Sequence, residues 1–227
     1  MSEIKIEDKA GVLPGDELAT GSEYLAGRGC FKENDTVKSK FLGTARIKNK
    51  KFNVVPLAGV YIPEKGDKVI GRITGVQVSS WWVEINSPYD GFLPLSEGTE
   101  EFVDLDKTEL SEIYDVGDIV YAEVIRVTKD KDVKLSMDSR MCKELNGGTI
   151  VRIRPSRVPR LIGKGGSMVK MIKDKTDTQI IIGQNGVVWV NGDKIELAEK
   201  AIKMVDKNGH MEGLTDKVRE MLESESE

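Results

Sequence analysis

The glycine segment Gly163-Lys164-Gly165-Gly166 constrains the fold of this chain more than any other feature of its sequence. The stretch 157–162 before it predicts a short helix, and the stretch 167–175 after it predicts a second one. Because glycines carry no Cβ atom, such a loop lets the backbone of a ligand approach closely, and the second helix would point free N–H groups at an anion. The same residues could also form a plain tight turn between two packed helices, so the flanking sequence is needed to distinguish the two.

The flanking sequence predicts an α+β order of elements. A strand is expected over 148–154, then the two helices, then a hairpin over 178–190 that closes at Asn185-Gly186, and finally an amphipathic helix. This order resembles a type I KH domain, and the stretch 161–172 resembles the Gly-x-x-Gly signature of that family. Within this order, RNA binding is favoured over a plain turn.

The KH resemblance implies a role for each part of the segment. In KH domains the glycine loop clamps about four nucleotides of single-stranded RNA, and the bases lie in an adjoining apolar groove. Here Ile162, Val169 and Ile181 are expected to line that groove. The expected RNA contacts in this domain are Arg152, Arg154, Arg160, Ile162, Gly163, Lys164, Gly165, Gly166 and Lys170.

Charge is distributed unevenly along the chain. The formal net charge is -4, yet residues 66–139 carry 7 basic and 16 acidic side chains, whereas residues 140–182 carry 10 basic and 3 acidic ones. A local basic patch matters more for binding a polyanion than an acidic average does. Such a charged run can also be an ordinary solvated surface. The coincidence of the patch with the glycine loop favours nucleic-acid binding.

The acidic segment predicts a small β-barrel. Alternating apolar residues recur in five short stretches separated by turn residues, which is typical of a closed barrel of the oligonucleotide-binding type. These stretches are 68–78, 81–85, 90–96, 116–127 and 133–137. The motifs within them resemble the S1 RNA-binding domain, namely Gly71-x-Ile73, Gly91-Phe92-Leu93, Gly117-Asp118 and Leu135-Ser136.

The S1 resemblance implies RNA contacts at Trp82, Phe92 and Lys134. Strand alternation places Trp82 on the outer face, where a stacked base would contribute about 1 to 3 kcal/mol. The sequence departs from the S1 pattern where RNA usually stacks, because the family's surface aromatic, histidine and arginine are replaced by Ser79, Pro94 and Asp132. Packing of Trp82 against a loop or a partner protein therefore stays open as an equal alternative.

The two ends of the chain carry no sign of chemistry. Residues 1–65 predict short strands between Pro/Gly turns, in a β-rich domain whose modest core favours docking on a neighbour. Residues 209–227 are expected to form an acidic tail. The expected fold class is multidomain, mainly β plus α+β, with an N-terminal β-rich domain, an S1-type barrel over 66–139 and a type I KH domain over 146–208.

Other features exclude whole classes of function. Two isolated cysteines, Cys30 and Cys142, and a single histidine, His210, leave too little material for a zinc centre or His-dependent catalysis. We therefore expect no metal, no cofactor and no catalytic residue. The longest stretch without a charge, 178–192, has 15 residues, short of the roughly 18 that a membrane helix needs. The charged N-terminus lacks the apolar core of a signal peptide, so a cytoplasmic protein without a membrane partner is expected.

The order of segments resembles one family along nearly the whole chain. A Val12-x-Pro14-Gly15-Asp16 motif, an S1 domain, a single KH domain and the stretch 183–190 around Asn185 and Trp189 follow one another. This order resembles the RNA-binding cap subunit of the archaeal exosome, the ribosomal RNA-processing protein 4 family. Trp189 itself is expected in the domain core or at a domain interface.

The family resemblance implies a non-catalytic subunit of a complex that degrades RNA from its 3′ end. Three copies would cap a six-membered ring of RNase PH-like subunits, alongside other cap subunits, with the first domain docked on the ring and single-stranded RNA fed to it. An S1/KH transcription antitermination or elongation factor that binds nascent RNA is the alternative, although such factors carry two consecutive KH domains. A polynucleotide phosphorylase is excluded, because it places KH before S1 and needs long catalytic domains.

Overall fold

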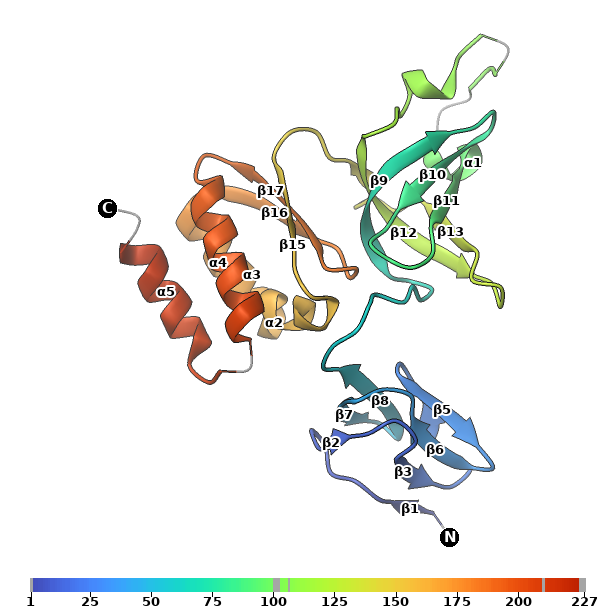
Figure 1. The fold of residues 1–227 in the computed structure, drawn as a ribbon, viewed down its shortest axis with the longest axis vertical. Coiled ribbons are helices and arrows are strands. Elements are labelled where there is room, and N and C mark those ends of the chain that lie inside the picture. The colour runs from blue at the N-terminus through green and yellow to red at the C-terminus, as the bar shows by residue number, and fades with distance from the viewer. Residues whose placement is uncertain (1, 100–102, 106, 210, 225–227) are drawn as a thin grey trace. The chain divides into compact units, whose positions relative to one another are not determined.

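The computed structural model describes residues 2–99, 103–105, 107–209 and 211–224, so His210 lies outside the described residues. The chain forms two compact units, Met1–Gly59 and Val60–Glu227 (Figure 1).

The first unit is built from short strands in two four-stranded sheets around one apolar core. One sheet has the order β1-β3-β6-β5 and the other the order β2-β7-β8-β4. Leu18, Val37 and Phe52 are fully buried between them. The strands are β1 Glu3–Ile4, β2 Gly11–Val12, β3 Glu17–Thr20, β4 Leu25–Ala26, β5 Cys30–Glu33, β6 Thr36–Ser39, β7 Gly43–Lys48 and β8 Lys51–Pro56.

The second unit begins with a closed five-stranded barrel, as the sequence predicts. Strand β12 pairs with both β9 and β13, and β13 pairs in parallel with β11, which closes the cylinder in the manner of an oligonucleotide-binding fold. Trp81 fills the core and donates a 2.9 Å hydrogen bond from Nε1 to the carbonyl of Tyr114. The elements are β9 Lys68–Val76, β10 Ser80–Glu84, β11 Gly91–Pro94, α1 Leu95–Gly98, a 3₁₀ turn Leu110–Glu112, β12 Ile119–Val127, β13 Val133–Ser136 and the short β14 Lys143–Glu144.

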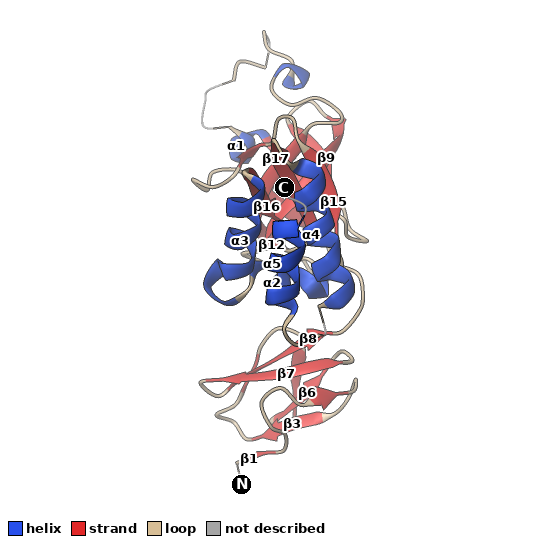
Figure 2. Cartoon of the chain, turned by 90° about the vertical axis from the view of Figure 1, so that its left-hand side faces the viewer, coloured by secondary structure: helices blue, strands red, loops and turns tan. Residues whose placement is uncertain are grey.

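An antiparallel three-stranded sheet with helices on one face follows the barrel, which is the α+β order predicted for a type I KH domain. The sheet order is β15-β17-β16, and the helices lie in front of the strands in Figure 2. The elements are β15 Thr149–Arg152, α2 Val158–Ile162, α3 Ser167–Thr176, β16 Thr178–Ile182, β17 Val187–Gly192 and α4 Ile195–Asn208, with 3₁₀ turns at Pro155–Arg157 and Lys164–Gly166.

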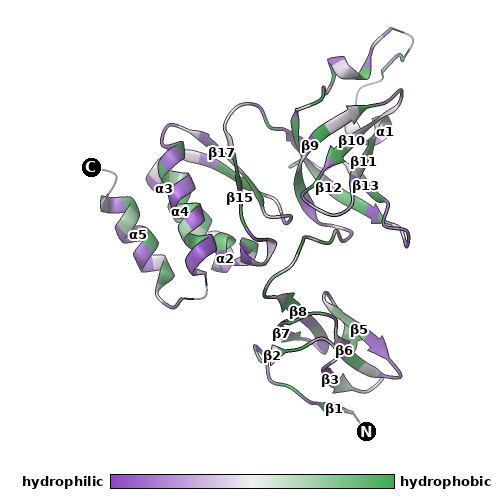
Figure 3. Ribbon diagram, viewed as in Figure 1, coloured by the Kyte–Doolittle hydropathy of each residue, from purple (hydrophilic) through white to green (hydrophobic). Residues whose placement is uncertain are grey.

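The expectation of an acidic tail after α4 is corrected by the structure. Residues Leu214–Ser224 form a further helix, α5, and its Leu214, Val218 and Leu222 are fully buried in the same core as α3 and α4. Their four-residue spacing puts the three side chains on one face of the helix, whereas the acidic residues lie on the other. Figure 3 shows the corresponding alternation of hydrophilic and hydrophobic residues along α4 and α5.

The other face of the three-stranded sheet packs against the barrel. Trp189 and Val187 of β17 form one buried cluster with Ile70, Tyr121 and Leu145 from the barrel side. Both faces of β17 are therefore covered, which explains why 187–190 are buried without interruption. The prediction that Trp189 lies in a core or an interface is confirmed.

Candidate nucleic-acid interface

The glycine loop between α2 and α3 uses its glycines for two different reasons. Gly163 has φ +76°, and a Cβ atom there would lie 2.8 Å from the backbone nitrogen of Met168, so packing inside the chain requires this glycine. Gly165 and Gly166 have φ values of +61° and +82°, and no described atom lies within 4 Å of a Cβ built on either. The space that a ligand could occupy therefore lies over Gly165 and Gly166, whereas Gly163 shapes the turn.

Helix α3 begins at this loop without a side-chain cap. Gly166 is its N-cap residue, and no side chain accepts a hydrogen bond from its first N–H groups. Uncapped N–H groups at a helix start attract an anion such as a phosphate. Lys164 and Lys170 are exposed, and neither has a hydrogen-bond or ion-pair partner within the described part of the chain. Backbone donors and two available cations thus meet at one surface.

The three arginines predicted to contact RNA differ in how firmly contacts within the chain hold their guanidinium groups. Arg154 donates from its backbone and its Nε to Asp206 Oδ1, at 3.1 Å each, and so ties β15 to the end of α4. Arg160 donates a 3.1 Å hydrogen bond to the carbonyl of Met211, which lies between α4 and α5. Arg152 is exposed and reaches Glu84 of the barrel at 3.5 Å. All three contribute positive potential, but only Arg152 has a loosely held guanidinium.

Of the three apolar residues expected to line a groove beside the loop, one lies on the other face of the sheet. Ile162 is 37% exposed beside the loop, and Val169 is half-buried on α3 against the core of the helices. Ile181 belongs to the cluster with Trp189 on the opposite face of the sheet, so the expectation that it lines the groove is wrong. Strand alternation instead puts Ile182 on the face that the helices cover.

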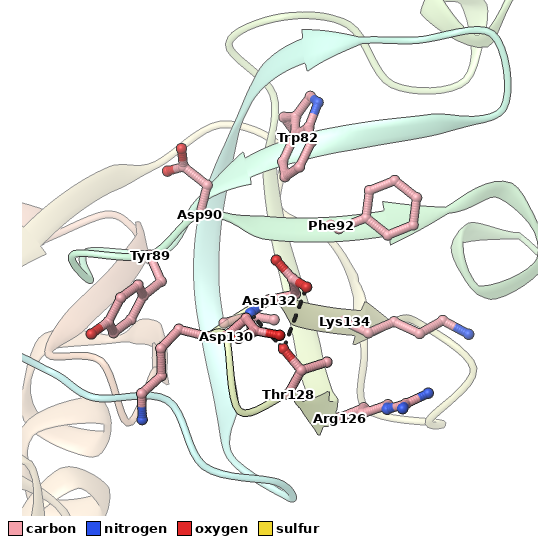
Figure 4. A pocket seen from close by; sticks show the side chains of 11 residues that line it. Trp82, Tyr89, Asp90, Phe92, Arg126, Thr128, Asp130, Asp132 and Lys134 are labelled. Atoms are coloured by element: carbon pink, nitrogen blue, oxygen red, sulfur yellow. Dashed lines mark hydrogen bonds between the residues drawn. The ribbon is translucent and has the colours of Figure 1, made fainter.

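The predicted barrel contacts lie together around an open pocket of about 580 Å³ (Figure 4). Trp82 on β10 is 39% exposed, and its ring meets that of Phe92 on β11 edge to face, with the centroids 5.6 Å apart. The two residues are direct partners in the β10–β11 ladder, which holds their side chains on the same outer face. Lys134 lines the same pocket.

The charges of this pocket are mixed. Lys134 makes a 2.9 Å ion pair with Glu97, and this contact lowers the pKa of the Glu97 carboxyl. Sequence reasoning missed Arg126, which faces the pocket from β12 and is paired with Lys134 in the β12–β13 ladder. The sequence feature that could have identified Arg126 is its place between the apolar Ile125 and Val127 near the end of the strand predicted over 116–127, since alternation puts such a residue on the outer face.

Exposed apolar side chains gather at one end of the first unit. Leu13, Leu42 and Leu57 are each at least 51% exposed, and Phe41 is 39% exposed. They are neighbours in space, because Val12 pairs with Gly43 in the β2–β7 ladder and the backbone nitrogen of Leu57 donates to the carbonyl of Leu42 at 3.1 Å. We name these four residues the apolar end.

Other kinds of site find little support in the described part of the chain. No group of three or more His, Cys, Asp or Glu side chains there could hold a metal ion. Burial raises the pKa of the Cys30 thiol to about 11, which disfavours the reactive thiolate. No described helix is long and apolar enough to span a membrane.

Comparison with known families assigns all three segments. The Exosome complex exonuclease RRP4 N-terminal region matches residues 12–48, the RRP4 S1 domain matches 60–126, and a KH domain matches 148–196. Together these matches cover more than half of the chain.

Individual relatives agree with that assignment along nearly the full length. The Exosome complex component Rrp4 of Methanobrevibacter smithii is 48% identical over 96% of this chain and 72% of its own. The protein of the same name from Methanothermus fervidus is 44% identical over 96% of both chains. A crystal structure of a protein provisionally assigned as an exosome complex RNA-binding protein is 32% identical, covers 74% of this chain and 97% of its own, and superposes with a TM-score of 0.68. The chain therefore belongs to the Rrp4 family of exosome complex components.

Proposed function

We propose that this chain binds single-stranded RNA as a non-catalytic subunit of an exosome complex and feeds the strand to catalytic subunits. The names of its relatives describe exosome components and an exosome RNA-binding protein, which supports both RNA binding and membership of an exosome complex. In this role the chain needs contacts with RNA and with protein, but no catalytic residue.

The observation that carries the proposal is the open surface over Gly165 and Gly166. It combines open space, the uncapped start of α3 and two cations, Lys164 and Lys170, that have no partner among the residues the structure describes. A sugar-phosphate backbone fits these features, since its negative charge matches the helix start and the two lysines, and the missing Cβ atoms let it lie close to the loop backbone. Ile162, beside the loop, offers an apolar surface for a base, and Gly163 keeps the turn in shape.

The barrel supplies a second RNA contact in the proposed arrangement. Trp82 and Phe92 offer ring surfaces for stacking, and Lys134 offers charge. The working division of the chain is a docking domain over 1–65, an S1 domain over 66–139 and a KH domain from 146 to 208, to which α5 is added. Arg152, Arg154 and Arg160 strengthen the positive potential of the last domain.

The apolar end of the first unit is proposed to dock on a ring of RNase PH-like subunits in the cytoplasm, next to other cap subunits. Four clustered, exposed apolar side chains are unusual on a free surface and typical of a protein contact. Replacing Leu42 and Leu57 by Ser should release the chain from the ring while RNA binding by the free chain persists.

Co-purification tests the proposed complex. A tagged chain recovered from its own cells should bring RNase PH-like subunits with it, whereas recovery of RNA polymerase instead would favour the antitermination alternative. Phosphate-dependent shortening of labelled RNA by the chain alone would contradict the non-catalytic role.

The salt dependence of RNA binding tests the KH surface. Lys164→Gln should make the slope of log affinity against log salt shallower by about 0.7, the contribution of one phosphate contact to a single strand. Lys217→Gln on the exposed side of α5 is the matched control and should leave the slope unchanged.

A further inference from the structure

We propose that Asp132 makes the barrel pocket select nucleotides by the base, favouring a base edge that carries an amino group over one that carries a carbonyl. The inference rests on the proposed RNA-binding function and names the substrate class of the Trp82 pocket.

The carboxylate of Asp132 is held in place by its own turn. Thr128 Oγ1 accepts a 3.0 Å hydrogen bond from the backbone nitrogen of Asp132 and donates at 3.4 Å to the carboxylate oxygen Oδ2. The turn closes with a 3.0 Å hydrogen bond from the Thr128 nitrogen to the Asp132 carbonyl. The second oxygen, Oδ1, has no hydrogen-bond partner among the described residues. One acceptor is thus positioned and unused.

This acceptor lies beside the aromatic surface. In Figure 4 the Asp132 carboxylate points toward Trp82 and Phe92, between the two rings and the Thr128 turn. A base stacked on these rings would turn its polar edge toward Asp132. An ionised carboxylate accepts hydrogen bonds only, so it pairs with an amino group and repels a carbonyl oxygen.

The pocket is polarised, which gives a bound nucleotide a direction. Its lining carries three carboxylates and three cations; Lys134 is also held by its ion pair with Glu97, whereas Arg126 has no ion-pair partner among the described residues. In Figure 4, Arg126 and Lys134 point to one side, whereas Asp90 lies on the other. The phosphate is therefore assigned to Arg126 and Lys134 and the base edge to Asp132, because each then meets the opposite partial charge.

Cytosine and uracil test this inference directly, since they have nearly the same shape and differ at one edge. Cytosine presents an N4 amino group, from which Asp accepts, and uracil presents O4 in the same place. We expect the full chain to bind a nine-nucleotide oligocytidine about tenfold more tightly than the matching oligouridine. This ratio corresponds to about 1.4 kcal/mol, close to the contribution of one hydrogen bond to a charged group. Fluorescence anisotropy with end-labelled oligonucleotides measures both affinities.

Two variants isolate the contribution of Asp132. Asp132→Asn should reduce the preference to less than about twofold, because the amide can donate to uracil O4, and it should not weaken binding overall. Asp138→Asn removes the same charge from an exposed position of the barrel outside this pocket and should keep the tenfold preference. A cytidine preference that survives Asp132→Asn, or equal affinities in the unaltered chain, would overturn the inference.

The outcomes also separate this inference from the proposed function. If neither oligonucleotide binds, both fail. If both bind equally and Trp82→Ala weakens both, RNA binding stands and base selection is wrong. If Trp82→Ala leaves RNA affinity unchanged but prevents assembly with ring subunits, the pocket is a protein contact and the inference is overturned.

Discussion

The side chain of Asn185 is predicted to stabilise the second unit by joining the hairpin loop to the barrel. It sits in the loop between β16 and β17 but is fully buried against the barrel. Its side-chain Nδ2 donates to the carbonyls of Ile70 and Ile85, at 2.7 and 2.8 Å, and its backbone carbonyl oxygen accepts from Asn86 Nδ2 at 2.8 Å. The β9–β10 ladder ends at Arg72 and Glu84, so this amide takes the place of the next strand pair.

Replacing Asn185 by Ala leaves two buried carbonyls without these donors. Each unsatisfied buried group costs about 1 to 3 kcal/mol, so we expect a loss of roughly 3 kcal/mol in the free energy of unfolding. With a urea slope of about 2 kcal/mol per M, the midpoint of unfolding should fall by about 1.5 M. Asn185→Asp keeps the shape but turns the donor into an acceptor, and should destabilise the unit at least as much.

Tryptophan fluorescence during urea unfolding measures this effect selectively. All three tryptophans of the chain, Trp81, Trp82 and Trp189, lie in the second unit, so unfolding of the first unit does not contribute. Asn191→Ala is the matched control, because Asn191 lies on β17 without a side-chain hydrogen bond among the described residues, and it should shift the free energy by less than about 0.5 kcal/mol. Equal midpoints for the Asn185→Ala and Asn191→Ala variants would refute the reasoning.

Three further predictions concern RNA binding and the C-terminal helix. Replacing both Gly165 and Gly166 by Asp should lower RNA affinity at least tenfold in an anisotropy titration, because it puts bulk and negative charge where the phosphates would lie. Thermal melting should change little, since Asp tolerates a positive φ. Gly213→Asp is the control, because Gly213 has φ +68° and equally open space around it. Trp82→Ala should lower RNA affinity roughly five- to hundredfold without changing the salt slope, because stacking releases few counterions; a changed slope would contradict a stacking role. Leu222→Ala should destabilise the second unit by about 2 to 5 kcal/mol in thermal unfolding, and no change would mean that α5 does not pack as described.

Local patterns in the sequence were sufficient to predict most of the fold. Period-two alternation gave the five barrel strands, and the hairpin predicted over 178–190 matches β16 and β17 closely. Glycine spacing located the loop before α3. These signals are reliable because they depend on backbone geometry and on which face of an element is buried, both of which act within a few residues. The same alternation placed Trp82 outward and Trp81 inward, as observed.

Only the tertiary structure decided which side chains lie in the contacts between the barrel, the three-stranded sheet and the helices. In the sequence, Asn185-Gly186 reads as a two-residue hairpin turn, but the loop spans 183–186 and the Asn185 side chain binds the barrel. Ile181 and Ile182 look alike in sequence, yet they face opposite sides of a sheet that is covered on both. The segment after α4 reads as an acidic tail in the sequence. A short isolated helix is barely stable in water, and α5 forms because Leu214, Val218 and Leu222 are buried in the core of the neighbouring helices. Contacts between elements far apart in the chain depend on how the finished units pack, and no local pattern encodes that packing.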